Sequence, residues 1–142
     1  MKILITNDDG IDAPGLAVLY KIALGLTSAE KILTVAPATE QSGVSHAISY
    51  HSSINLEKIT KNRWACHGTP ADCVIVGISE YNQKFDLVLS GVNRGNNAGQ
   101  NTMYSGTVGA TIEAADENYL QNEFCRAIYF LKIGHLYKCE IL

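Results

Sequence analysis

The sequence predicts an α/β fold built on a mostly parallel sheet. Three short apolar runs, at residues 2–6, 31–37 and 85–89, have the length and continuous apolar character of strands buried on both faces. Helix-like segments separate or follow these runs. Two such strands joined by a helix form a βαβ unit, in which the strands are parallel.

The first βαβ unit occupies the amino-terminal part of the chain. Its strands are residues 2–6 and 31–37, and its helix is expected to run from about Pro14 to Leu26. Pro14 suits the first turn of a helix, where its missing N–H costs nothing. Apolar residues recur inside the helix at helical spacing, namely Leu16, Leu19, Ile22, Ala23 and Leu26.

Residues 41–66 are less regular and predict short strands or a hairpin with loops. A second helix is expected to follow and to run through about Ile78. Its start is marked by Thr69, Pro70 and Asp72, which are the residue types favoured at the N-cap, first and third positions of a helix.

A long loop rich in Gly and Asn is expected from Ser90 to Asn101, and residues 104–111 look like a helix start rich in small residues. Open parallel sheets bind ligands at the carboxyl ends of their strands. The three loops expected there, at residues 7–10, 37–45 and 90–101, are all rich in oxygen-bearing side chains and glycine. The sequence therefore predicts a ligand site where these loops converge.

The composition predicts one globular domain of 142 residues with a substantial core. Apolar residues make up 46% and charged residues 18% of the chain, which excludes a disordered protein. The net charge of −3 argues against a surface that coats nucleic acid, and no apolar run reaches transmembrane length. We therefore expect neither a nucleic-acid polymer nor a membrane as a partner.

The amino terminus and the cysteines predict a cytoplasmic protein. The first residues turn acidic too soon for a signal peptide. The four cysteines contain no CxxC pair and no zinc-site spacing, so reduced thiols are expected at Cys66, Cys73, Cys125 and Cys139.

Asp8 and Asp9 are the leading candidates for chemistry. Two adjacent carboxylates at the end of a buried strand repel each other and are costly to desolvate, so a divalent metal or a cationic side chain is expected between them. The plainer alternative is that Asp8 caps the following helix and Asp9 is solvated, since Asp is common in turns. The neighbouring loops favour the metal interpretation.

Ser42 and Asn93 are neutral oxygen donors on the other two loops. Mg²⁺ and Mn²⁺ prefer oxygen ligands, and their sites combine one or two carboxylates with water and substrate phosphate. Singly, these two residues read as a turn residue and a loop-shaping residue. Together with Asp8 and Asp9 they predict a metal site.

An anion site is expected beside the metal. Three glycines between Gly91 and Gly99 could bring backbone N–H groups close to a phosphate, although a flexible surface loop is the plain alternative. Ser105, Gly106 and Thr107 lie at the expected helix start, where free amides attract anions. Ser105 could equally be an ordinary N-cap, and Arg94 could contact phosphate or remain a solvated loop residue.

Five motifs, in this order, closely resemble the SurE family of stationary-phase survival proteins with 5′/3′-nucleotidase activity. They are Asn7-Asp8-Asp9-Gly10 with Ala13-Pro14-Gly15, Ala36-Pro37 with Gln41-Ser42-Gly43, Gly68-Thr69-Pro70-Ala71-Asp72-Cys73, Ser90-Gly91-Val92-Asn93 with Gly95 and Asn97, and Tyr104-Ser105-Gly106-Thr107-Val108. The resemblance implies a Rossmann-like three-layer α/β/α domain. It also implies a metal-dependent hydrolase of phosphoric monoesters that acts on nucleoside monophosphates.

The family's site residues carry over to this sequence. The implied ligands of a divalent cation, Mg²⁺ or Mn²⁺, are Asp8, Asp9, Ser42 and Asn93. Asp8 and Asp9 could also orient or deprotonate the attacking water. The segment implied beside the phosphate comprises Gly95, Asn97, Ser105, Gly106 and Thr107.

The chain departs from the family in two places. Ala38 and Thr39 stand where the family commonly has Asp-Arg, so a charged contact near the site is missing. The resemblance covers residues 1–115 and then fades, which predicts a partial SurE-like domain, a divergent tail over residues 116–142 and truncation at the carboxyl end. The resemblance implies a homo-oligomer, but the section that supplies the family's assembly elements is missing here.

Two alternatives to the nucleotidase follow. The first is a truncated, inactive SurE remnant that binds metal or nucleotide without turnover, because ligands need rigid support for catalysis. The second is a Rossmann-like domain that binds a nucleotide cofactor. It is disfavoured because no GxGxxG follows the first strand.

Overall fold

The computed structural model describes residues 1–79, 84–95, 97, 99–120, 126–133 and 136–141. Its helices are α1 (Pro14–Leu24), α2 (Pro70–Ser79) and α3 (Gly106–Leu120), with 3₁₀ turns at Ala29–Lys31 and Gly99–Tyr104. Its strands are β1 (Ile3–Thr6), β2 (Ile32–Pro37), β3 (Leu56–Thr60), β4 (Arg63–Cys66), β5 (Leu87–Asn93), β6 (Arg126–Ile133) and β7 (Leu136–Ile141). No helix in these residues is long and apolar enough to cross a membrane.

The strands form one sheet in the order β3-β4-β2-β1-β5-β6-β7. The pairs from β4 to β6 are parallel. The outermost strands β3 and β7 pair antiparallel with β4 and β6. The predicted α/β fold with a mostly parallel sheet is therefore confirmed.

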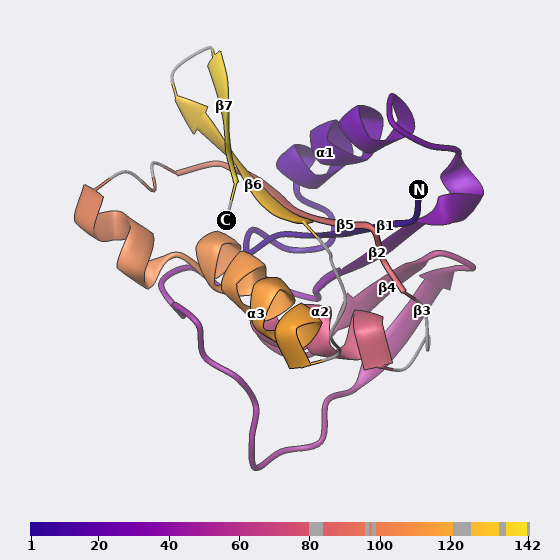
Figure 1. The fold of residues 1–142 in the computed structure, drawn as a ribbon. Helices are drawn as coiled ribbons and strands as arrows, with labels where there is room; N and C mark the ends of the chain where they lie inside the picture. The colour runs from indigo at the N-terminus through magenta and orange to yellow at the C-terminus, as the bar shows by residue number, and fades with distance from the viewer. Residues whose placement is uncertain (80–83, 96, 98, 121–125, 134–135, 142) are drawn as a thin grey trace.

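Helices cover both faces of the sheet (Figure 1). Successive side chains of a strand point to opposite faces. Ile3 and Ile5 of β1 belong to the same core cluster as Leu16 and Leu19 of α1. Leu4 points the other way, into a second cluster that includes Val74 of α2 and Ala110 of α3. The result is the three-layer α/β/α arrangement that the resemblance implied.

The strand predicted at residues 85–89 extends further along the chain in the structure. The loop expected from Ser90 to Asn101 is wrong in its first part, because β5 continues through Asn93. Ser90 pairs with Thr6 of β1 on one side and with Tyr129 of β6 on the other. Two neighbouring strands therefore override the weak strand propensity of Gly and Asn. The last residues of the expected loop, from Gly99 on, belong to the 3₁₀ turn Gly99–Tyr104.

Helix α1 begins at Pro14 as predicted but ends at Leu24 rather than Leu26. Gly25 follows its last residue and donates its N–H to carbonyls of the final turn, which closes the helix. Helix α3 begins at Gly106, inside the expected start at residues 104–111.

The predicted cap of α2 is confirmed. Thr69 Oγ1 accepts a hydrogen bond from the Asp72 N–H at 3.1 Å, and Asp72 Oδ2 accepts one from the Thr69 N–H at 2.8 Å. This is a reciprocal capping box. Asp72 is 1% exposed and also accepts two bonds from Ser49, through its N–H and its hydroxyl. The carboxylate therefore joins the loop before β3 to the start of α2.

Replacing Asp72 by Ala is expected to lower the free energy of unfolding by about 2–4 kcal/mol, because it removes a cap and leaves buried donors without an acceptor. Urea denaturation measures the change. Asp116→Ala, at an exposed position of α3, is the control and is expected to change stability by less than about 0.5 kcal/mol. Equal losses in the two variants would contradict this role of Asp72.

Residues beyond the point where the resemblance fades also form part of the sheet. β6 pairs in parallel with β5, and β7 returns antiparallel beside it, as the yellow strands of Figure 1 show. The edge of β5 that faces away from β1 is therefore covered within this chain.

The cysteines agree with the prediction where the structure describes them. Cys66 and Cys73 are free and buried, and burial raises the pKa of the Cys73 thiol well above its ordinary value. Cys125 lies outside the described residues, and only the backbone of Cys139 is described.

Candidate metal and phosphate site

The carboxyl ends of β1, β2 and β5 meet at one edge of the sheet, and a cavity of about 380 Å³ opens there. Seven of the nine predicted site residues line it, namely Asp8, Asp9, Ser42, Asn93, Gly95, Asn97 and Ser105. They come from segments far apart in the sequence. A larger cavity of about 520 Å³ lies beside α1, but its walls are mainly apolar and contain none of the predicted residues.

Asp8 is buried at the base of the site, with 5% of its surface exposed. Its Oδ1 accepts a hydrogen bond from the Thr107 hydroxyl at 2.6 Å. Burial raises the pKa of the Asp8 carboxyl above its ordinary value, and the nearby charge of Asp9 adds to this, although the bond from Thr107 opposes it. A bound cation would relieve both the desolvation and the repulsion.

Asp9 is half-buried, and its Oδ2 accepts a hydrogen bond from the Arg94 backbone N–H at 2.9 Å. The alternative in which Asp8 caps the next helix is wrong, because the N-cap of α1 is Ala13 and no side chain caps it. Both carboxylates are instead oriented by groups from the far side of the site, at the end of β5 and the start of α3.

Ser42 and Asn93 bring neutral oxygens to the same cavity. The Ser42 hydroxyl donates to Glu40 Oε1 at 2.7 Å, so the hydroxyl's lone pairs remain to coordinate a cation. The Asn93 amide nitrogen donates to the Gly95 carbonyl at 3.2 Å, which leaves the amide oxygen as its ligand atom.

The loop that carries Ser42 is held against α3 and the 3₁₀ turn before it. The Ser45 hydroxyl donates to the Met103 carbonyl at 2.6 Å, and His46 Nε2 lies 2.6 Å from Glu113 Oε2. A Cβ on Gly109 would lie only 2.4 Å from the Ser45 carbonyl oxygen, so the absence of a side chain there permits the contact.

The start of α3 supplies the predicted phosphate segment. Ser105 is the N-cap, because its Oγ accepts a bond from the Val108 N–H at 3.2 Å. The same oxygen accepts a bond from Asn97 Nδ2 at 2.6 Å. Gly106 and Thr107 lie behind Asp8 rather than in the cavity wall. A Cβ on Gly106 would come within 2.9 Å of Asp8 Cβ.

The donor set suits a hard divalent cation. Two carboxylates, one hydroxyl and one amide oxygen match the preferences of Mg²⁺ and Mn²⁺ and leave positions for water and phosphate. Within the described part of the chain, no group of three or more His, Cys, Asp or Glu side chains could hold a metal. A zinc-type cluster is therefore not found there, and the mixed oxygen set is the candidate.

Sequence reasoning missed several lining residues. Glu40, Asn101 and Tyr104 line the cavity but were not predicted. Arg94 also lines the cavity. This position suits a contact with phosphate, one of the two interpretations left open for it. Glu40 could have been noticed from its position two residues before Ser42, whereas the other two depend on the 3₁₀ turn that brings Asn101 and Tyr104 back to the site.

A sequence model of the family described as survival protein SurE matches residues 3–120. The chain belongs to the SurE family. Two of its relatives are proteins named 5′-nucleotidase SurE from Cereibacter sphaeroides and Roseobacter denitrificans, 58% and 54% identical over 118 residues. These matches cover 81% of this chain and 45% of each relative. The chain therefore spans about half the length of the curated SurE relatives it matches.

The fold of the chain is also similar to a solved SurE structure. The crystal structure of SurE protein from Aquifex aeolicus matches with a TM-score of 0.72 and 27% sequence identity. The match covers 94% of this chain and 67% of the Aquifex chain. A match of this share extends beyond residues 3–120, the segment that the family model matches.

Proposed function

We propose that this SurE-family chain is a metal-dependent 5′/3′-nucleotidase that hydrolyses nucleoside monophosphates to nucleoside and phosphate. The observation that supports it is the convergence of Asp8, Asp9, Ser42 and Asn93 on one cavity. Relatives that share more than half of the matched residues are named 5′-nucleotidase. Every group that the proposal uses lies within residues 1–115, the part for which we propose the SurE-like metallophosphatase domain.

The four oxygen-bearing side chains would hold Mg²⁺ or Mn²⁺. When bound, such an ion lowers the pKa of a water molecule and offsets negative charge on the phosphoryl group. Asp8 and Asp9 hold fixed orientations through Thr107 and Arg94, so either carboxylate can orient the attacking water or accept its proton.

The phosphate oxygens would be held at the start of α3. Ser105 Oγ already accepts bonds from Asn97 and Val108, so its own O–H is the hydrogen left to donate. This hydroxyl lines the cavity and can donate to a phosphate oxygen. The backbone amides of Gly95 and Asn97, which line the cavity, add donors, and the helix dipole favours the anion.

A second candidate is binding of metal or nucleotide without turnover. The chain spans 45% of the length of its relatives, so the activity of those longer proteins is proposed for this chain and not carried over from them. An enzyme needs its ligands held rigidly, and the rest of the family sequence could contribute to that support.

Metal removal separates the two candidates. The purified 142-residue chain is expected to release phosphate from AMP with Mn²⁺ or Mg²⁺. Phosphate release should stop after EDTA treatment and resume when the metal is restored. Phosphate release measures the reaction, and isothermal titration measures metal binding. A folded chain that binds Mn²⁺ without releasing phosphate from any nucleoside monophosphate would favour the second candidate.

A further inference from the structure

We propose that a second cavity beside the metal site binds the uncharged nucleoside part of the substrate; this inference rests on the proposed nucleotidase function. The cavity has a volume of about 320 Å³, within the range of small-molecule sites. Its polar lining comes from Thr39, Gln41, Ser49, His67, Gly68 and Thr69. We call it the neutral cavity.

The neutral cavity and the metal site share one wall. Along residues 38–43, Thr39 and Gln41 line the neutral cavity, whereas Glu40 and Ser42 line the metal site. The Gln41 backbone N–H donates to the Asp8 carbonyl at 2.7 Å, so a single stretch of backbone separates Asp8 from the neutral cavity. A ligand anchored at the metal site therefore needs to cross only this segment.

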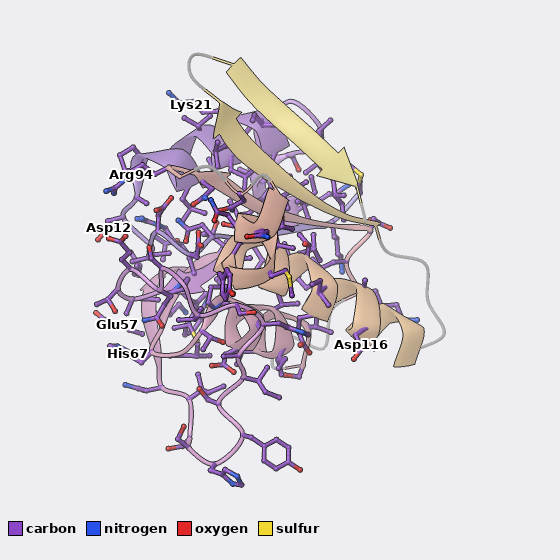
Figure 2. The ribbon with its side chains drawn as sticks, turned by 90° about the vertical axis from the view of Figure 1, so that its left-hand side faces the viewer. Asp12, Lys21, Glu57, His67, Arg94 and Asp116 are labelled. Atoms are coloured by element: carbon purple, nitrogen blue, oxygen red, sulfur yellow. The ribbon has the colours of Figure 1, made fainter. Side chains whose placement is uncertain are left out.

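Labelled residues of both cavities also lie on the same side of the molecule. Figure 2 shows Arg94, from the metal site, and His67, from the neutral cavity, at the left-hand side of the view. Asp116, in the last turns of α3, lies at the right-hand side. A nucleotide with its phosphate at the metal site can thus place its nucleoside in the neutral cavity without passing through the core.

The charges of the two cavities differ in the way a nucleotide requires. The metal site carries carboxylates and a place for a cation, which suit the phosphate. The lining of the neutral cavity consists of three hydroxyls, an amide, an imidazole and the Cys66 thiol, with Ala38 and Gly68 between them. Glu57 lies near its rim, 3.9 Å from His67 Nε2. A ribose or a base, which hydrogen-bonds without carrying charge, fits this lining.

An anion is disfavoured in the neutral cavity although the start of α2 borders it. The Asp72 carboxylate already accepts the Thr69 N–H and both donors of Ser49. This negative charge occupies the positive end of the helix dipole and would repel a phosphate. The phosphate is therefore assigned to the metal site and the nucleoside to the neutral cavity, not the reverse.

Gln41 is the central recognition group of the proposal. Its side chain is half-buried, and the hydrogen bond from its Nε2 to Thr39 Oγ1 is long, at 3.5 Å. An amide offers two donors and one acceptor. Gln41 can therefore donate to and accept from a base edge or a ribose hydroxyl at little cost to the protein's own bonds.

The test compares two substrates of the full chain with Mn²⁺. AMP carries a nucleoside, and p-nitrophenyl phosphate carries neither ribose nor base. Gln41→Ala is expected to raise KM for AMP about tenfold, because one or two hydrogen bonds to the nucleoside are lost. The same variant should keep kcat/KM for p-nitrophenyl phosphate within about twofold of the wild-type value. Asn62→Ala is the control. It removes a half-buried amide before β4, at the opposite edge of the sheet, and is expected to leave the kinetics with both substrates unchanged.

Equal effects of Gln41→Ala on both substrates, or no effect on either, would overturn the assignment. If the wild-type chain hydrolyses neither ester, the proposed catalytic function fails. Adenosine binding then tests separately whether the neutral cavity is a nucleoside site. Saturation-transfer NMR without metal measures adenosine binding. We expect the wild type and Asn62→Ala to bind adenosine, and Gln41→Ala to bind it about tenfold more weakly. Equal adenosine binding by all three proteins, or none by any of them, would refute the neutral cavity as a nucleoside site.

Discussion

Replacing Asp9 by Asn is expected to lower kcat/KM for nucleoside monophosphates by about a thousandfold or more, because it removes a charged ligand at the reacting phosphate. Asp8→Asn should have an effect of the same size. An Asn amide preserves the shape of the carboxylate and can still accept the bond from Arg94 or Thr107, but it lacks the negative charge that holds a divalent cation. Phosphate release gives the rate, and isothermal titration with Mn²⁺ gives the affinity.

Thermal denaturation shows whether this loss is local. Asp8 is buried beside Asp9, so Asp8→Asn relieves a buried charge and is expected to leave the metal-free protein at least as stable as the wild type. Mn²⁺ should raise the melting temperature of the wild type and not that of the variant. Asp86→Asn, an exposed carboxylate beside Lys2 at the other end of β1, is the control and should keep full activity. Full activity in Asp8→Asn or Asp9→Asn would rule out the proposed metal site.

Gly15→Ala is expected to destabilise the fold by about 3 kcal/mol or more, because an added methyl group cannot fit between α1 and β5. A Cβ on Gly15 would lie 1.9 Å from the Val92 carbonyl oxygen, and a backbone oxygen in a central strand cannot move aside. The helix would have to shift away from the sheet. Urea denaturation measures the loss.

Gly25→Ala is the matched control at the other end of α1. Gly25 has φ −70 and ψ −16, a conformation open to any residue, and a Cβ there would meet only the Ile22 carbonyl, at 3.2 Å. The free energy of unfolding of Gly25→Ala is expected to differ from that of the wild type by less than about 1 kcal/mol. A Gly15→Ala variant as stable as Gly25→Ala would show that α1 does not pack against β5 as closely as described.

The candidate site was largely predictable because its residues follow strands. Asp8 and Asp9 come directly after β1, and their adjacency is visible in the sequence. Which oxygen atoms orient them was not predictable. Thr107 lies 99 positions along the chain from Asp8, and Arg94 lies 85 positions from Asp9. Hydrogen bonds across such separations exist only after the sheet has brought the start of α3 and the end of β5 to β1.

Glu40 and Gln41 show the same limit on a shorter scale. They are adjacent, yet one side chain lines the metal site and the other the neutral cavity. The backbone bends at Ala38 and Thr39 and turns at Ser42 and Gly43, so this separation does not come from the alternation of a strand. The segment is held by the bonds from Gln41 N–H to the Asp8 carbonyl and from Ala38 N–H to the Cys66 carbonyl. No local pattern in residues 38–43 indicates those anchors.

By itself the sequence determined the order of strands and helices as far as α3, the mostly parallel sheet, the capping box of α2 and the pair of carboxylates at the end of β1. These features depend on hydrophobic periodicity and on residue types at helix and strand ends, which act over a few residues. Only the tertiary structure decided that Ser90–Asn93 joins the sheet, that Gly15 contacts Val92 and that a neutral cavity lies behind Asp8. Those outcomes depend on which distant segments become neighbours, because burial between two strands or against a helix outweighs the local preferences of Gly and Asn.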